Sequence, residues 1–202
     1  MRYLRYGIEL ERLETKHLDI VRQWRNQERV RLRMQYKEEI SPGSQANWFN
    51  ALDLHNDWYF VADAKQIPFG MFHVKEIDWL HKTGEAGGFV GNQGLIGGVE
   101  AGMAILALMD FAFFMLGLEF LEATYRCDCR DIEALNCQLG YEVFKYQSNG
   151  FVRARVSSAR FLAVTKEPRR AAEQLWGDGE RLVDADPWLT QHIRSLSPSR
   201  VR

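Results

Sequence analysis

The chain has 202 residues, of which 46% are apolar and 26% are charged. A chain of this length and composition can bury one hydrophobic core without disulfide or metal staples. Its formal net charge of −1 argues against a nucleic-acid-binding protein, for which a clear basic excess is expected. The cysteines, Cys127, Cys129 and Cys137, lack the second pair that a structural zinc site needs, so we expect no metal and a reducing compartment.

The most apolar stretch runs from Gly97 to Leu118, but Glu100 and Asp110 interrupt it. Charges inside a membrane-spanning helix are costly, so the stretch predicts a buried core helix. Residues 1–10 contain two arginines and no long apolar run, which is unlike a secretory signal. We therefore expect a cytoplasmic protein without a membrane partner.

The first half of the chain predicts alternating helices and strands. Ile8 to Leu13 alternates apolar and charged residues, as a half-exposed strand does. A helix is expected after Thr15, a candidate N-cap residue, and a second one after Ser41. Further strands are predicted over residues 58–62, 69–77 and 84–90.

The second half begins with a glycine-rich loop over residues 91–98, followed by a long apolar helix over 99–116 that Gly117 ends in a left-handed conformation. Further along, the patterns predict a strand over 120–126, a short helix over 131–139, and two strands over 141–146 and 151–164 joined by the hairpin turn Ser148-Asn149-Gly150.

The last residues differ in character from the rest. Residues 166–202 are polar, with one helix expected over 169–175. We therefore divide the chain into a domain over residues 1–165 and a polar, partly helical extension over 166–202. The basic excess of this end fits packing on the acidic body or on a second subunit, or else a loosely ordered terminus.

The glycine-rich loop lies between a strand and a helix. The free N–H groups and the dipole at a helix start favour an anion such as a phosphate. No Gly-Lys-Ser/Thr follows the loop, and the spacing Gly-x-Gly-x-x-Gly is absent, which excludes a Walker loop and a dinucleotide fingerprint. Phosphate binding and a tight strand-to-helix turn both remain open.

Several segments, in this order and spacing, resemble the GNAT superfamily of acyl-CoA N-acyltransferases over about residues 8–146. Residues 84–91, Gly-Glu-Ala-Gly-Gly-Phe-Val-Gly, are similar to the family's strand pattern, and residues 93–101 resemble its Arg/Gln-x-x-Gly-x-Gly pyrophosphate loop. Shorter matches are Trp24-Arg25-Asn26, Ala46-Asn47-Trp48-Phe49 and Gln138-Leu139-Gly140-Tyr141. The resemblance implies an α/β (α+β) fold with a mixed, mostly antiparallel central sheet, flanked by helices and splayed to hold CoA.

The same resemblance implies an N-acetyltransferase that moves an acetyl group directly from acetyl-CoA, its co-substrate, to a primary amine. The branch with these segments includes nucleotide-amino-sugar and ribosomal-protein N-terminal acetyltransferases. We expect a small-molecule amine as partner, with an amino sugar nucleotide as one candidate and a homodimer left open. The alternatives are a protein N-terminal acetyltransferase and a binding or regulatory module with degenerate catalytic residues.

By resemblance, the cofactor site consists of Phe89, Val90, Gly91, Gln93, Gly94, Leu95, Ile96, Gly97, Gly98, Val99, Cys129 and Asn136. Ile96 stands where the family has the first required loop glycine, and a β-branched residue does not easily take a positive φ. Cys129 stands where the family often has asparagine. Asn136 stands where many members have the tyrosine that protonates the leaving thiolate, which an amide cannot do.

Catalysis requires a group that takes the amine proton. Glu85 is the first candidate for this base and His73 the second. The structural alternatives are a strand carboxylate facing solvent or a basic neighbour, and a packed strand histidine. Trp24, Asn26 and Trp48 are candidates for contacts with the acceptor, although tryptophans at such positions also serve in core packing.

Overall fold

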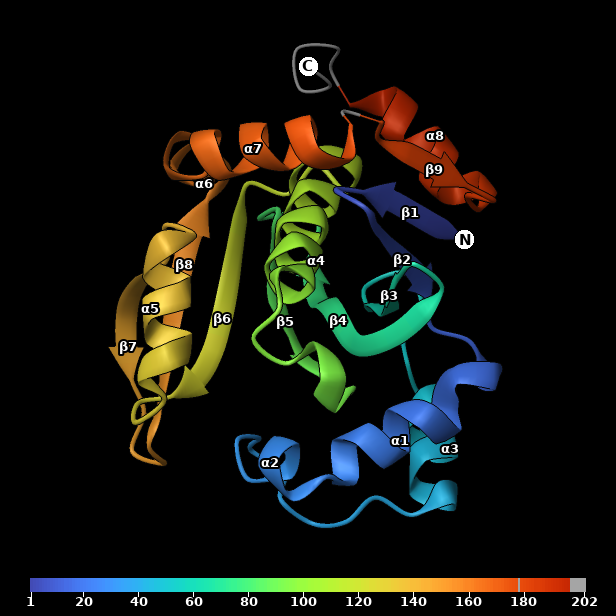
Figure 1. Ribbon diagram of the computed structural model, residues 1–202, viewed down its shortest axis with the longest axis vertical. Coiled ribbons are helices and arrows are strands. Elements are labelled where there is room, and N and C mark those ends of the chain that lie inside the picture. Colours follow the sequence, from blue (N-terminus) through green and yellow to red (C-terminus); the bar gives the residue numbers. More distant parts are fainter. Residues whose placement is uncertain (178, 197–202) are drawn as a thin grey trace.

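The computed structural model describes residues 1–177 and 179–196. In this part of the chain, one nine-stranded sheet has the order β7-β8-β6-β5-β4-β3-β2-β1-β9 (Figure 1). Neighbouring strands are antiparallel except for β5 and β6, which are parallel. The strands are β1 (Arg2–Arg5), β2 (Ile8–Arg12), β3 (Trp58–Ala64), β4 (Ile67–Asp78), β5 (Thr83–Val90), β6 (Phe120–Arg126), β7 (Glu142–Tyr146), β8 (Phe151–Ser157) and β9 (Arg181–Val183). The predicted mixed, mostly antiparallel sheet is confirmed.

Helices cover both faces of the sheet (Figure 1). They are α1 (Leu18–Asn26), α2 (Glu28–Arg31), α3 (Pro42–Asn50), α4 (Val99–Asp110), α5 (Arg130–Gln138), α6 (Ser158–Val164), α7 (Lys166–Trp176) and α8 (Pro187–Ser195). Strand β3 begins with a continuous run of apolar residues in the sequence, and the structure explains this. Trp58 and Phe60 pack into the main core with α4, whereas Tyr59 and Val61 pack into a second core with α1. A strand buried on both faces has no polar side to alternate with.

Local signals fix several element ends where the sequence predicts them. Ser41 caps α3, because its Oγ accepts a hydrogen bond from the Ser44 N–H at 3.1 Å. Gly117 and Gly140 end their helices with φ of +68° and +89°, in the left-handed region that costs glycine little. The long helix predicted over 99–116 is α-helical only to Asp110 and then continues as the π-helical turn η3 (Phe111–Met115).

Two sequence predictions are wrong in detail. Residues 158–164, predicted as strand, form α6, which Ser157 begins by accepting a hydrogen bond from the Arg160 N–H. Thr15 is not an N-cap but lies inside the 3-10 turn η1 (Thr15–His17), and Glu14 precedes that turn. The Glu14 N–H donates to Nδ1 of His17 at 3.0 Å. The His17 side chain therefore satisfies the backbone N–H of the residue that precedes the turn.

The C-terminal residues that the structure describes pack against the rest of the chain. Strand β9 pairs with β1 at the edge of the sheet. On α7, Arg169 lies 3.0 Å from the buried carboxylate of Asp110. On α8, Trp188 contacts the ring of Trp79 at 5.2 Å between centroids. Of the predicted extension, residues 178 and 197–202 lie outside the described residues.

Within residues 1–177 and 179–196, no helix is long and apolar enough to cross a membrane. The same residues contain no group of three or more His, Cys, Asp or Glu side chains that could hold a metal ion.

Candidate functional site

The sheet divides between β5 and β6. These strands pair for three residue positions, the last of which joins Glu85 to Glu122. Beyond that point β5 stays paired with β4 as far as Val90, and β6 stays paired with β8 as far as Arg126. The two strands therefore separate after Glu85, as Figure 1 shows, and the predicted splay is present.

The exposed edge of β5 offers alternate backbone groups to this opening. The Gly91 N–H donates to the Phe69 carbonyl on the β4 side at 2.7 Å. In an antiparallel ladder successive residues face opposite ways, so the N–H and C=O groups of Gly88 and Val90 face the opening. Of the predicted cofactor-site residues at this end of β5, Val90 has this orientation, while the amides of Phe89 and Gly91 point to β4.

A large pocket of about 790 Å³ lies beside the opening. Its walls come from α1, α3, the segment between α2 and α3, and strands β3 to β6 and β8. It brings together the two predicted base candidates, Glu85 and His73, with Trp48 and Phe89. Trp48 and Phe89 are 41 positions apart in the sequence but share one cavity, because α3 packs against the neighbouring strands β3, β4 and β5.

Glu85 lies where the strands separate. Its Oε1 is 3.1 Å from Nζ of Lys75 on β4, and its Oε2 accepts a hydrogen bond from Oγ1 of Thr124 on β6 at 3.0 Å. Lys75 also pairs with Glu76 at 2.6 Å. Burial alone would lower the pKa of Lys75, but the two carboxylates raise it. Glu85 is therefore a carboxylate held in place from both sides of the opening.

His73 lies in the same pocket with its ring 5.0 Å from that of Tyr59. Burial, and secondarily the charge of Lys75, lowers the pKa of His73 to about 3. The imidazole is therefore neutral near pH 7 and has little tendency to take up a proton. Gly87 leaves room for it, since a Cβ there would lie 2.9 Å from the ring Nε2. This contact explains one glycine within β5.

The glycine-rich loop is partly bonded to itself. Asn92 Oδ1 accepts from the Gly94 N–H at 3.0 Å, and the Gly98 N–H donates to the Leu95 carbonyl at 3.3 Å. The left-handed position falls on Gly97, with φ of +75°, whereas Ile96 has an ordinary φ of −70°. The loop is thus reshaped by one residue relative to the family pattern, and Ile96 carries no backbone strain.

The N-terminus of α4 already faces a carboxylate. A side chain built on Gly98 would overlap Oε2 of Glu100, so this carboxylate lies at the end of the helix where a phosphate is expected. Negative charge is stabilised there by the helix dipole and the free N–H groups. A pyrophosphate would have to displace the Glu100 side chain, a requirement that the sequence pattern does not reveal.

Arg29 supplies a positive charge that the loop lacks. Its Nη1 donates to the Val90 carbonyl at 2.9 Å and its Nη2 to the Gly91 carbonyl at 2.7 Å. The guanidinium comes from α2, about sixty residues earlier in the chain, and it lies at the end of β5 beside the start of the loop. The residues from Val90 to Gly98 include no Lys or Arg, so only the fold brings a cation there.

The predicted acceptor residues have three different positions. Trp48 lines the large pocket and packs edge-on against Tyr59 with 5.1 Å between ring centroids. Asn26 bonds both backbone groups of Ile40, at 2.9 Å and 2.8 Å. Trp24 is buried in the second core and packs against Gly91. Trp48 alone of the three lines the described pocket.

A Gly91→Ala variant is expected to be destabilised by roughly 1–3 kcal/mol, the usual cost of overpacking. The new methyl would overlap the Trp24 indole and force α1 away from the sheet. Gly94→Ala is the control, because its nearest neighbour would be Asn92 Oδ1 at 3.4 Å. Urea denaturation measures both variants, and equal midpoints would contradict the close contact.

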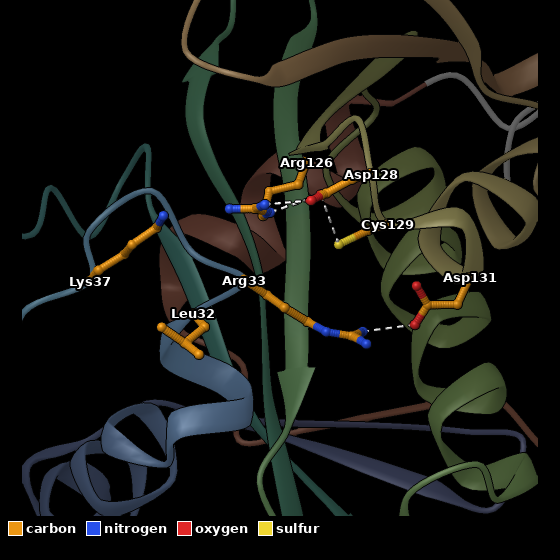
Figure 2. A pocket seen from close by; sticks show the side chains of 7 residues that line it. All are labelled: Leu32, Arg33, Lys37, Arg126, Asp128, Cys129 and Asp131. Carbon is orange, nitrogen blue, oxygen red and sulfur yellow. Dashed lines mark hydrogen bonds and ion pairs between the residues drawn. The ribbon is translucent and has the colours of Figure 1, made fainter.

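A small pocket of about 420 Å³ contains Cys129 (Figure 2). Arg33, from the segment after α2, reaches across it to Asp131 on α5, with 2.7 Å between Nη1 and Oδ2. On the far wall Arg126 pairs with Asp128 through Nε at 2.9 Å. Burial raises the pKa of the Cys129 thiol, so this thiol is not activated as a nucleophile.

Asn136 is buried, and its side chain lies close enough to Tyr125 on β6 to influence the pKa of the phenol. Burial raises the pKa of Tyr125, which keeps the phenol protonated at neutral pH. The sequence patterns did not point to Tyr125. The signal that could have found it is the alternation of β6, which places Tyr125 on the same face as Leu121 and Ala123 and hence toward the helices that cover that side.

Comparison of the sequence with protein-family models and with curated proteins finds no match. Among solved structures, the spermidine N-acetyltransferase of Vibrio cholerae in complex with CoA and spermine aligns with a TM-score of 0.68 at 18% identity, covering 78% of this chain and 99% of that one. The RimL ribosomal-protein alpha-N-acetyltransferase in complex with coenzyme A aligns at 0.64 and 11% identity, covering 75% and 94%.

A domain from Methanocaldococcus jannaschii aligns similarly, with a TM-score of 0.65 at 15% identity over 74% of this chain and 97% of that one. The chain has the GNAT fold. The resemblance read from the motifs between about residues 8 and 146 is thereby confirmed at the level of the fold. Within this GNAT fold, the opening between β5 and β6, the large pocket and the glycine-rich loop lie next to one another.

Proposed function

We propose that this chain is an acetyl-CoA-dependent N-acetyltransferase that transfers the acetyl group directly to a primary amine of a small molecule. The observation that carries the proposal is the opening of the sheet after Glu85, with the large pocket beside it. Two of the structurally similar proteins are N-acetyltransferases in complex with CoA, which supports acetyl-CoA as the co-substrate.

The chain fits acetyl-CoA at three places. The β5 edge at Gly88 and Val90 offers backbone groups to an extended chain such as the pantetheine arm, and Arg29 adds a positive charge beside the loop. The start of α4 would take the pyrophosphate once the Glu100 carboxylate moves aside. The thioester would then lie at the opening, within the part of the site that contains Glu85.

The proposed reaction needs a free amine, a polarised carbonyl and a route for two proton transfers. The amine enters through the large pocket and attacks the thioester carbon, and one N–H group of the β5 edge stabilises the negative charge on the oxygen. Glu85 takes the amine proton, directly or through water. The C=O bond then re-forms as the C–S bond breaks, and Tyr125, beside Asn136, gives its proton to the departing thiolate.

Calorimetric titration with CoA tests the cofactor assignment. The wild-type chain is expected to bind CoA, and Gly98→Val is expected to abolish detectable binding, because the added side chain lies at the helix start near Glu100 and the Leu95 carbonyl. Gly102→Ala, on the same helix with nothing within 4 Å of the new methyl, is the control and should bind as wild type. Failure of the wild type to bind CoA would overturn the proposal, and unchanged affinity of Gly98→Val would remove the loop from the site.

One alternative function has structural support. A binding or regulatory module that retains the fold is favoured by the loop that bonds to itself and by the Glu100 carboxylate at the phosphate position. A thermal shift with acetyl-CoA, followed by thiol-release assays on a panel of amines and peptide N-termini, separates the functions. A module would show no thiol release, and a protein N-terminal acetyltransferase would release thiol with peptides in preference to small amines.

A further inference from the structure

Positive charge dominates the wall of the large pocket. The basic residues that line it are Arg25, Arg33, Lys75 and Arg153, and the acidic residues that line it are Glu76 and Glu85. Both of these carboxylates pair with Lys75, at 2.6 Å and 3.1 Å. The two carboxylates exceed the charge of Lys75 by one, so the lining residues leave the three arginines mostly unbalanced from within the pocket.

Arg25 is the least compensated of these cations. Its Nη2 donates to the Tyr36 carbonyl at 2.7 Å, while its Nη1 is buried without a hydrogen-bond partner in the part of the chain that the structure describes. Burial and then the charge of Arg31 lower the pKa of Arg25. Both effects disfavour its cation, and an anion bound beside it would offset both.

Arg153 adds to this excess. It shares the buried carboxylate of Glu122 with Arg155, so two guanidinium groups are balanced by one negative charge. Arg33, by contrast, is paired with Asp131 outside the large pocket. The pocket thus combines an ion-pair cluster around Lys75, in which two carboxylates share one ammonium group, with guanidinium groups at Arg25 and Arg153 that are not fully balanced.

This charge distribution opposes a polycationic acceptor. A polyamine carries several ammonium groups, and each beyond the reacting one needs a carboxylate partner when it leaves water. The two lining carboxylates share Lys75 and exceed its charge by only one, which is fewer than the ammonium groups that a polyamine carries besides the reacting one. The similar Vibrio cholerae protein is a spermidine N-acetyltransferase, so the charges in this pocket indicate a different acceptor despite the shared fold.

We propose that the acceptor is a primary amine that also carries an anionic group, a carboxylate or a phosphate, which Arg25 binds while the amine is directed to Glu85. The inference rests on the proposed acetyltransferase function and narrows it. A guanidinium group binds both kinds of anion through paired N–H donors. The ligand would supply the partner that the buried Nη1 of Arg25 lacks.

The test compares matched acceptors that differ by the anionic group. Thiol release is measured with glucosamine 6-phosphate against glucosamine, with 6-aminohexanoic acid against hexylamine, and with spermidine. For the wild type we expect kcat/KM to be about tenfold or more higher for one of the two anionic members than for the partner that lacks the anionic group, since hydrogen bonds to charged groups are of that strength. The pair that shows the preference identifies the anionic group of the acceptor as a phosphate or a carboxylate.

The Arg25→Gln variant should lose this preference, with kcat/KM falling about tenfold more for the anionic member than for the member that lacks the anionic group. Arg31→Gln is the matched control, because Arg31 is next to Arg25 but does not line the pocket, and it should keep the preference. If Arg25 has only a structural role, the variant will lower kcat/KM equally for both members of each pair. That result would overturn the inference.

Failure of the inference and failure of the proposed function are distinguishable. Turnover that favours spermidine or the amines without an anionic group would overturn the anionic acceptor and leave the acetyltransferase intact. Absence of CoA binding would overturn both. Titration of the same pairs in the presence of CoA gives a readout that does not depend on turnover, and equal binding of the two members of each pair would also reject the inference.

Discussion

An Asp110→Ala variant is expected to lose roughly 3–5 kcal/mol of unfolding free energy, the usual effect of removing one partner from a buried ion pair. Asp110 is 0% exposed. Its carboxylate lies 3.0 Å from Arg169 and 3.5 Å from Arg5, and it accepts a hydrogen bond from the Tyr6 hydroxyl at 2.6 Å. Removing it leaves two largely buried guanidinium groups short of one negative charge.

The same carboxylate joins three parts of the fold. Arg5 ends β1, Asp110 ends α4, and Arg169 is on α7. Arg5 also pairs with Glu173 on α7 at 2.7 Å. We therefore expect α7 to loosen from the sheet in the variant, with faster proteolysis after residue 165 as a second sign of the same loss.

Urea denaturation followed by circular dichroism measures the loss of stability. Asp131→Ala is the control, because its ion pair with Arg33 has similar length, 2.7 Å, but exposed side chains. Exposed pairs contribute little to stability, so this control should remain close to wild type. An Asp110→Ala midpoint equal to that of the control would show that Arg5 and Arg169 do not depend on the buried carboxylate.

The Glu85→Gln variant should reduce kcat by roughly 10²–10³, within the range expected when a general base is lost. The amide keeps the size of the side chain and can still accept the hydrogen bond from Thr124, but it cannot take a proton from the amine. Calorimetric affinity for CoA should stay the same, because Glu85 contributes to the acceptor side of the opening.

Glu76→Gln is the matched control for this prediction. Glu76 pairs with the same lysine as Glu85, but its side chain is 70% exposed, so kcat should change little. Equal turnover of Glu85→Gln and wild type would eliminate Glu85 as the base and leave His73. The pKa of His73 is about 3, so this imidazole stays unprotonated between pH 7 and pH 5. If His73 were the base, its protonation would therefore cause no loss of rate in that pH range.

The sequence by itself determined the GNAT fold. Its decisive features are local: the order of strand, glycine-rich loop and long helix, and the turn residues at Ser41, Gly117 and Gly140. Each of these features acts on residues close by in the sequence, through a helix cap, a left-handed φ or a repeat of apolar residues. It also singled out Glu85, His73 and Trp48, which the structure places in one pocket.

Only the tertiary structure decided which groups these residues meet. The hydrogen bond of Thr124 to Glu85, the guanidinium of Arg29 at the end of β5, and the phenol of Tyr125 beside Asn136 all join distant segments. The edge strand β9 likewise forms by pairing with β1, about 180 residues earlier in the chain. The physical reason is that ionic charge, hydrogen bonding and burial act through space, so a residue's pKa and its partners depend on the strands and helices folded against it.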